Sequence, residues 1–372
     1  MQTITEHSSK INAALPQKDV HAGMEVFYNP IMESNRNISI LLLNSIENKS
    51  MNIALPLAGS GIRVIRFIKE LENGKINHLF VNDKKENFVR TFNDNLKLNK
   101  LKKNKVSVHN EEASLFLLNR VDDKKKPENF CGYFDYIDID PFGSPNPFIS
   151  AAIARISRNG ILAVTSTDTA ALTGTYPKVT KRKYWARMTK NYMMHELGLR
   201  VLIRKIQLQG VQFEKALIPV LSYHKDHYFR IYFRSERGKI KCGHIIKQHQ
   251  YLLLNPKTLK FKISEFNKEK GFDYFGPLWT GKLSDNDLLE KMSKNNLFKN
   301  EQIFLNMLKS EIDIPGFYDL HTISKKYKLP TPKTEVVLKK LKATGTHFSR
   351  YGVKTEKDIK EIVSLMKYEK GR

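Results

Sequence analysis

The first half of the chain alternates short apolar runs with helical patterns, and each run ends in small or polar residues. The runs occupy residues 53–57, 76–81, 106–109, 133–137 and 161–166. Four or five strands alternating with helices are typical of a parallel, doubly wound α/β sheet. Two further β-rich runs, at residues 215–223 and 227–233, predict a hairpin that closes a mixed sheet. Ligands of such sheets bind beyond the carboxyl ends of the strands, so we expect function there.

Residues 138–145, with the sequence DIDPFGSP, form the most distinctive of these strand ends. A carboxylate followed at once by proline and an aromatic ring presents rigid acceptors and a flat surface, which favours Asp140, Pro141 and Phe142 as functional residues. Taken alone, the same residues also fit an ordinary proline-glycine turn capped by aspartate. We expect Asp138, which lies within the strand end, to be structural.

The other strand ends carry residue types that suit a nucleoside ligand. Gly59 and Gly61 form a turn before a helix, where the backbone can approach a ligand closely, although a structural tight turn explains them equally well. Asp83 follows the second strand, where a carboxylate can accept from a ribose diol or simply cap the next helix. Glu112 follows the third strand and can accept from an adenine amino group, while the small Ala113 leaves room for the base.

The charge of the chain favours a polyanionic partner. Lys and Arg number 63 against 38 Asp and Glu, a formal net charge of +25. An anionic membrane surface is the alternative, but no run approaches the roughly 18 apolar residues of a spanning helix, so we expect nucleic acid and no membrane. The two cysteines, Cys131 and Cys242, lack the spacing of a disulfide framework or a metal site, which predicts a reduced, cytoplasmic protein without a bound metal.

The second half of the chain is less regular and strongly basic. At 372 residues there is room for two domains, and we predict their boundary near 234–238, giving domains of 1–236 and 237–372. Helix patterns at 319–327 and 333–341, separated by two prolines, predict a winged-helix-like segment. Residues 181–187, with the sequence KRKYWAR, indicate a phosphate-binding rim or else a solvated helix start. Asn159 and Gly160 are expected to end a helix.

Together these motifs resemble the tRNA guanine-26 N2-dimethyltransferase family. The matching motifs are VFYNP at 26–30 with Asn35 and Arg36, SGIR at 60–63 with Arg66, Asn82 with Asp83, DIDPFGSP at 138–145, TDT at 167–169 with Gly174 and Thr175, GPLW at 276–279, and THF at 346–348. The likeness spans nearly the whole chain.

The resemblance implies a Rossmann-like class I methyltransferase domain that uses S-adenosylmethionine, followed by a smaller basic α+β domain that holds tRNA. It assigns cofactor contacts to Arg36, Arg66, Asp83, Glu112 and Ala113, and the catalytic carboxylate to Asp140. Many family members carry four cysteines ahead of the GPLW motif, whereas this chain has only Cys242 there, so we do not expect it to have their zinc site. No obligate protein partner is inferred.

The chemistry of guanine agrees with this assignment. The exocyclic amine of guanine is a poor nucleophile, and a carboxylate such as Asp140 that accepts its N–H can turn it toward a sulfonium methyl group. Pro141 would stiffen the turn and supply a carbonyl, Phe142 would stack on the base, and Phe27 would close the other side. The alternatives are an N-methyltransferase acting on another amine or amide in protein or DNA, and a non-catalytic RNA-binding protein.

Overall fold

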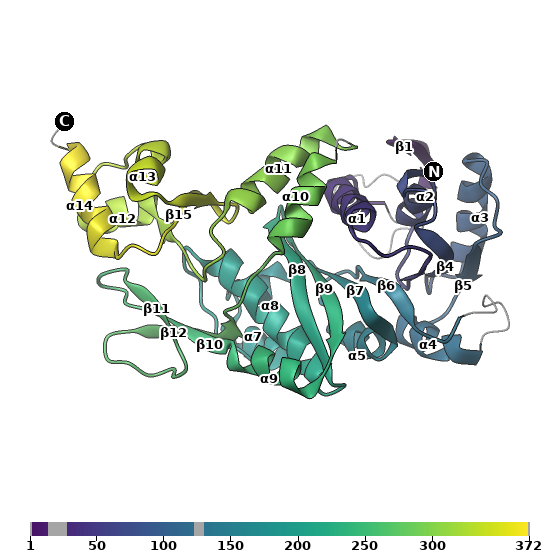
Figure 1. Ribbon diagram of the computed structural model, residues 1–372, viewed down its shortest axis with the longest axis horizontal. Coiled ribbons are helices and arrows are strands. Elements are labelled where there is room, and N and C mark those ends of the chain that lie inside the picture. Colours follow the sequence, from purple (N-terminus) through teal and green to yellow (C-terminus); the bar gives the residue numbers. More distant parts are fainter. Residues whose placement is uncertain (1, 14–27, 123–129, 296, 371–372) are drawn as a thin grey trace.

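A seven-stranded sheet forms the centre of the computed structural model, which describes residues 2–13, 28–122, 130–295 and 297–370 (Figure 1). The strand order is β5-β4-β3-β6-β7-β9-β8. Strands β3 to β7 run parallel, while β9 is antiparallel to β7 and pairs with β8 as a hairpin. The strands are β3 Met51–Leu55, β4 Ile76–Asn82, β5 Val106–His109, β6 Phe134–Ile139, β7 Ile156–Ser166, β8 Lys215–Lys225 and β9 Tyr228–Arg237. The predicted mostly parallel sheet closed by a hairpin is confirmed.

Helices cover both faces of this sheet. Successive side chains of a strand point to opposite faces, so each face packs against its own set of helices. Ile137 and Ile139 of β6 pack in the hydrophobic cluster that contains α4, α5 and α8, whereas Tyr136 packs in the cluster that contains α1, α2 and α3. The helices are α1 Glu33–Ser45, α2 Ile62–Glu70, α3 Phe88–Leu98, α4 Ala113–Leu118, α5 Asn146–Arg155, α6 Thr169–Leu172, α7 Pro177–Tyr184 and α8 Met194–Val211, with 3-10 turns at η1 Pro30–Met32 and η2 Asn119–Asp122.

An N-terminal hairpin lies beside α2 and α3. Its strands are β1 Gln2–Glu6 and β2 Ser9–Ala13, which pair in antiparallel register. Ile11 and Ala13 of β2 are buried in the same cluster as the helices α1 to α3. The hairpin is therefore part of the packed structure.

The chain after β9 builds two smaller sheets. The first has the order β11-β10-β12, and the second has the order β13-β15-β14 next to α12, α13 and α14. The elements are α9 Lys239–Lys247, β10 His249–Leu254, β11 Phe261–Ser264, β12 Asp273–Trp279, α10 Asn286–Lys294, α11 Lys299–Ser310, β13 Tyr318–Asp319, α12 Leu320–Tyr327, α13 Thr334–Leu341, β14 Thr344–Thr346, β15 Ser349–Lys354 and α14 Ile359–Lys370. Both helices expected between 319 and 341 are present, as α12 and α13.

Hydrophobic clusters connect much of this second part to the central sheet. Leu278 and Trp279 of β12 pack in the cluster of α8, and Leu289 of α10 packs in the cluster of α1. The helices α12 to α14 have a cluster of their own. The boundary at residue 237 and the winged-helix-like segment stay predictions.

A buried group of charges joins α8 to the last sheet. One carboxylate oxygen of Glu196 accepts from Arg200 Nε at 2.8 Å, from Lys354 Nζ at 3.1 Å and from the backbone N–H of Gly316 at 2.9 Å. Burial raises the pKa of Glu196, but Lys354 and Arg200 more than offset this and hold it below its ordinary value. Removing one partner of a buried ion pair costs about 3–5 kcal/mol, so this contact fixes the C-terminal elements against α8.

Candidate active site at the carboxyl edge of the sheet

The loop that follows β6 is held in place by the residues that follow β7. The backbone N–H of Gly143 donates to Thr167 Oγ1 at 2.7 Å, and the N–H of Thr167 donates to the Gly143 carbonyl at 3.0 Å. The Tyr184 hydroxyl of α7 lies 3.0 Å from Ser144 Oγ and 2.8 Å from Asp168 Oδ2. Gly143 has a φ of 77°, which favours glycine at this turn. The loop is therefore a fixed platform beyond two strand ends.

Asp140 lies on this loop and is paired with an arginine from α2. Its Oδ2 accepts from Arg63 Nη2 at 2.6 Å, and 22% of its side chain is exposed. The same guanidinium lies 3.4 Å from Asp138 and donates to Asn35 Oδ1 and Ser39 Oγ, each at 2.9 Å. Arg63 therefore fixes one oxygen of a carboxylate that remains partly open to solvent.

Asp138 is buried below this pair and has a different set of partners. Arg230 of β9 donates to both of its oxygens, at 2.8 and 2.9 Å, and the Tyr136 hydroxyl donates at 2.8 Å. Burial raises the pKa of Asp138, but Arg230 and Arg63 outweigh this and hold it below its ordinary value. Burial likewise opposes the charge of Arg63, yet Asp138 and Asp140 raise its pKa above its ordinary value. The two aspartates therefore differ in exposure and in partners.

Asn82 connects the ends of β3, β4 and β5, a role that the sequence did not indicate, although Asn82 is part of a motif shared with the family. Its side-chain amide donates to the carbonyls of Pro56 and Glu111, each at 3.0 Å, and its Oδ1 accepts from the N–H of Glu111 at 2.9 Å. Asn82 is completely buried. Its partners come from neighbouring strand ends, and for that reason the pattern along one segment could not have revealed the role.

Asp83 and the glycine turn contact each other. Asp83 accepts from the backbone N–H of Gly59 at 2.8 Å and from that of Lys85 at 3.1 Å. Helix α3 begins only at Phe88, so Asp83 does not cap it, and the helix-cap alternative for Asp83 is wrong. Gly61 has a φ of 77°, and a Cβ there would lie 2.3 Å from the Phe92 ring, so packing of α3 requires this glycine.

Glu112 and Ala113 lie at the end of β5. The Glu112 carboxylate accepts from the backbone N–H groups of Ser114 at 2.7 Å and Leu115 at 3.0 Å, which makes it the N-cap of α4. Ala113 is the first residue of that helix and is buried. In this structure the carboxylate is used by the helix, and an additional contact to adenine stays a prediction.

Arg36 and Arg66 bind a carboxylate of the N-terminal hairpin. Glu6 Oε1 accepts from Arg36 Nε at 2.7 Å and from Arg66 Nη1 at 2.8 Å, while Oε2 pairs with Arg36 Nη2 and accepts from the Tyr28 hydroxyl at 2.9 Å. Arg66 also donates twice to Glu70, at 2.7 and 2.9 Å, and is completely buried. Whether either arginine contacts a cofactor stays a prediction. Glu6 carried no sequence signal, and Phe27 lies outside the described residues.

Comparisons with known proteins decide the family. A model described as N2,N2-dimethylguanosine tRNA methyltransferase matches residues 4–367 of the chain. The chain belongs to this family. Membership confirms the family predicted from the sequence motifs and the assignment of the chain as a methyltransferase enzyme.

Two relatives of the family and one solved structure illustrate the similarity. The tRNA (guanine(26)-N(2)/guanine(27)-N(2))-dimethyltransferase of Aquifex aeolicus is 34% identical, and the alignment covers 98% of this chain and 96% of that protein. The tRNA (guanine(26)-N(2))-dimethyltransferase of Pyrococcus horikoshii is 32% identical over 99% of both. The structure of Trm1 from P. horikoshii with S-adenosyl-L-methionine has a TM-score of 0.87 at 31% identity and covers 98% of this chain and 100% of that chain. This likeness confirms the predicted Rossmann-like fold with a further C-terminal part.

The residues that the structure describes offer neither a cluster of metal ligands nor a helix that could cross a membrane. Within them, no three His, Cys, Asp or Glu side chains gather in a way that could hold a metal ion. None of the helices described there has both the length and the apolar content needed to cross a bilayer.

The Glu6 contacts predict a pH-dependent contribution to stability. Burial raises the pKa of Glu6, but Arg36 and Arg66 outweigh it and lower the value from 4.5 to about 2. A depressed carboxyl pKa stabilises the fold above the unfolded value and loses this effect as pH falls toward the folded value. We expect Glu6→Gln to lower the free energy of unfolding by about 3 kcal/mol near pH 7 and by clearly less near pH 3.5.

Urea unfolding of the wild-type and variant proteins at both pH values measures this difference. The control is Glu72→Gln, which changes an exposed carboxylate and should alter stability by about 0.5 kcal/mol or less. A Glu6→Gln effect that stays constant between the two pH values would show that the carboxylate charge is not what holds the hairpin.

Proposed function

We propose that the chain transfers methyl groups from S-adenosylmethionine to the exocyclic N2 of guanine 26 in tRNA, giving N2-methyl- and N2,N2-dimethylguanosine. The family match over residues 4–367 carries this proposal. Asp140 supports it because a partly exposed carboxylate stands beyond a strand of a parallel sheet, where such folds bind their ligands. A cytoplasmic location is part of the proposal, as is the division into a catalytic part, 1–236, and a tRNA-binding part, 237–372.

The strand ends offer groups that fit the nucleoside part of the cofactor. Each oxygen of Asp83 accepts one backbone N–H, so the carboxylate retains lone pairs for two ribose hydroxyls. Gly59 and Gly61 are proposed to let the cofactor approach the backbone of the neighbouring turn, although the Phe92 ring fills the space next to the Gly61 Cα. Glu112 and Ala113 at the end of β5 would lie along the adenine. When bound, the cofactor supplies a methyl group activated by the sulfonium sulfur.

Arg36 and Arg66 are proposed to serve the carboxylate end of the cofactor. The contacts of Glu6 support this assignment in one respect, because the two guanidiniums together already hold a carboxylate. Arg66 is completely buried, so a direct contact would require Glu6 or its hairpin to give way. Arg36, which is 5% exposed, is the more accessible of the two.

Asp140 is proposed to accept a hydrogen bond from the guanine amine and to take up the proton that the nitrogen loses. Arg63 holds Oδ2, so Oδ1 is the oxygen directed to the substrate. A positioned general base contributes typically about 10²–10⁴-fold to a rate. Pro141 limits the backbone next to Asp140, and its carbonyl offers a second acceptor.

Phe142 and Phe27 are proposed to enclose the base. The Phe142 side chain is 48% exposed, so a flat apolar surface is presented next to Asp140. Extruding a stacked or paired base costs a few kcal/mol, which stacking in the pocket offsets. The net charge of +25 would supply affinity for the tRNA backbone.

The direct test of this function is mass spectrometry of nucleosides from an unmodified tRNA transcript after incubation with the enzyme and S-adenosylmethionine. We expect N2-methyl- and N2,N2-dimethylguanosine, and we expect both to disappear when guanine 26 of the transcript is replaced by adenine. Methylation that persists in the substituted transcript would assign a different position. Absence of methylated guanosine from both transcripts would overturn the proposed function.

Replacing the catalytic carboxylate separates chemistry from binding. Asp140→Asn keeps the shape of the side chain but removes the base, so we expect single-turnover methyl transfer to slow by at least about 10²-fold. Cofactor affinity measured by calorimetry should change little. The control is Asp226→Asn, in the tight turn between β8 and β9, which should leave the rate unchanged. A comparable rate in Asp140→Asn would contradict the assigned role.

A further inference from the structure

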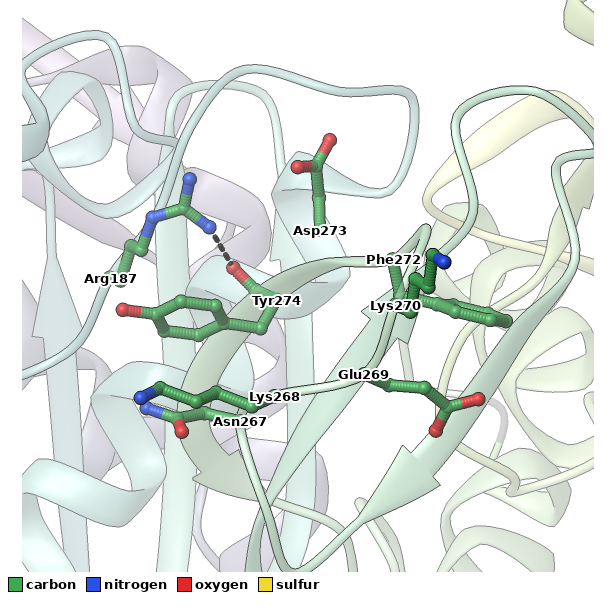
Figure 2. Close-up of a pocket in the computed structure, with 8 residues that line it drawn as sticks. All are labelled: Arg187, Asn267, Lys268, Glu269, Lys270, Phe272, Asp273 and Tyr274. Carbon is green, nitrogen blue, oxygen red and sulfur yellow. Dashed lines mark hydrogen bonds between the residues drawn. The ribbon is translucent and has the colours of Figure 1, made fainter.

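A surface hollow of about 470 Å³ lies between Arg187, which follows α7, and the loop that connects β11 to β12 (Figure 2). Its lining includes the cations Arg187, Lys268 and Lys270 and the ring of Tyr274. The volume falls within the range of about 300–1,000 Å³ that is usual for ligand sites. No part of the catalytic loop contributes to the lining.

The charges of the hollow are distributed unevenly. Figure 2 shows the Tyr274 ring between the side chains of Arg187 and Lys268, while the Glu269 carboxylate points in the direction opposite to the Lys268 amino group. Glu269 is paired with Lys262 Nζ at 2.5 Å, so its charge is balanced outside the hollow. The lining includes one further carboxylate, Asp273, against the three cations Arg187, Lys268 and Lys270, so the hollow is basic on balance.

Arg187 and Tyr274 form a cation–π pair. The guanidinium carbon lies 4.4 Å from the centre of the Tyr274 ring, and Nη1 donates to the Tyr274 carbonyl at 2.6 Å. The backbones are also fixed, because Arg187 and Gly276 exchange two hydrogen bonds of 2.8 and 2.9 Å. A guanidinium has five N–H donors in one plane, so further donors remain to bind a phosphate.

The hollow is connected to the catalytic loop through α7. Tyr184 at the end of α7 contacts Ser144 of that loop, and the side-chain amide of Asn146 donates to the Lys183 carbonyl at 3.0 Å. Only two residues lie between Tyr184 and Arg187, so the two are at most about 10 Å of extended chain apart. A nucleic-acid strand that presents a base to Asp140 would therefore reach the hollow within a few nucleotides.

Trp185 follows Tyr184 in the sequence, two residues before Arg187, and is 49% exposed. Lys205 Nζ lies 3.1 Å from the centre of its ring, but Lys205 is buried, so the exposed surface here is that of the Trp185 ring. Basic side chains interleaved with exposed aromatic rings are the usual surface for single-stranded or extruded nucleotides.

We propose that this hollow binds the phosphodiester backbone of the tRNA strand that flanks the methylated base, with the Arg187–Tyr274 pair as a planar contact for a phosphate or a neighbouring base. The inference rests on the proposed function, since it takes tRNA as the substrate. It goes further in assigning part of the RNA contact to named residues outside the catalytic loop.

Charge reversal tests the proposal. Lys268→Glu/Lys270→Glu should weaken binding of unmodified tRNA by about tenfold or more and reduce the slope of log affinity against log salt by about 2. The matched control is Lys102→Glu/Lys103→Glu, which makes the same charge change between α3 and β5, at the opposite end of the molecule (Figure 1). The methyl-transfer rate at saturating tRNA and the cofactor affinity should stay at the wild-type values in both.

A conservative variant tests the planar contact separately from the charge. Arg187→Lys retains the positive charge but loses the planar set of guanidinium donors. We expect about threefold to tenfold weaker tRNA binding, with an unchanged methyl-transfer rate at saturating tRNA. Wild-type affinity in both Arg187→Lys and Lys268→Glu/Lys270→Glu, or equal losses in the control pair, would overturn the proposed surface. Selective loss of tRNA binding in an enzyme that methylates no guanine would support the surface while rejecting the proposed function.

Discussion

The arrangement of the candidate active site depends on one buried ion pair between Arg230 and Asp138. Charges removed from water are costly unless they are paired, and the two bonds from Arg230 to Asp138 pair these charges within the sheet. Asp138 in turn lies beside Arg63, and Arg63 holds Asp140. The position of Asp140, the proposed catalytic carboxylate, is thus determined by a chain of charges that begins in the core of the fold.

The central sheet could be predicted because its strands are marked by local patterns. Strand β5 was predicted at its observed bounds. Strand β6, Phe134–Ile139, begins one residue later and ends two residues later than the run expected at 133–137. The expected end of a helix at Asn159 and Gly160 is wrong, since both residues lie within β7, where Asn159 has a φ of 61° and the pairing with β6 shifts register. The asparagine-glycine pattern is the same in a helix end and in such a strand irregularity, and only the neighbouring strand distinguishes them.

The partners of the site residues could not be predicted for a related reason. The contact of Arg63 with Asp140 spans 77 residues and that of Arg230 with Asp138 spans 92, so no spacing within one segment encodes either. Glu6 reaches Arg66 across 60 residues in the same way. Residue types at strand ends identified which side chains to consider, whereas the fold determined which of them are paired with each other and which remain open to solvent.

The central claim is that Arg63 acts through Asp140, and a double-mutant cycle measures this most directly. Single-turnover methyl transfer would be compared in wild type, Arg63→Gln, Asp140→Asn and the variant with both changes, together with tRNA and cofactor affinities. If Arg63 serves to orient Asp140, it matters only while that carboxylate is present, so the double variant should be no slower than Asp140→Asn alone. Rate losses that multiply in the double variant would show that the two side chains act independently and would contradict this account.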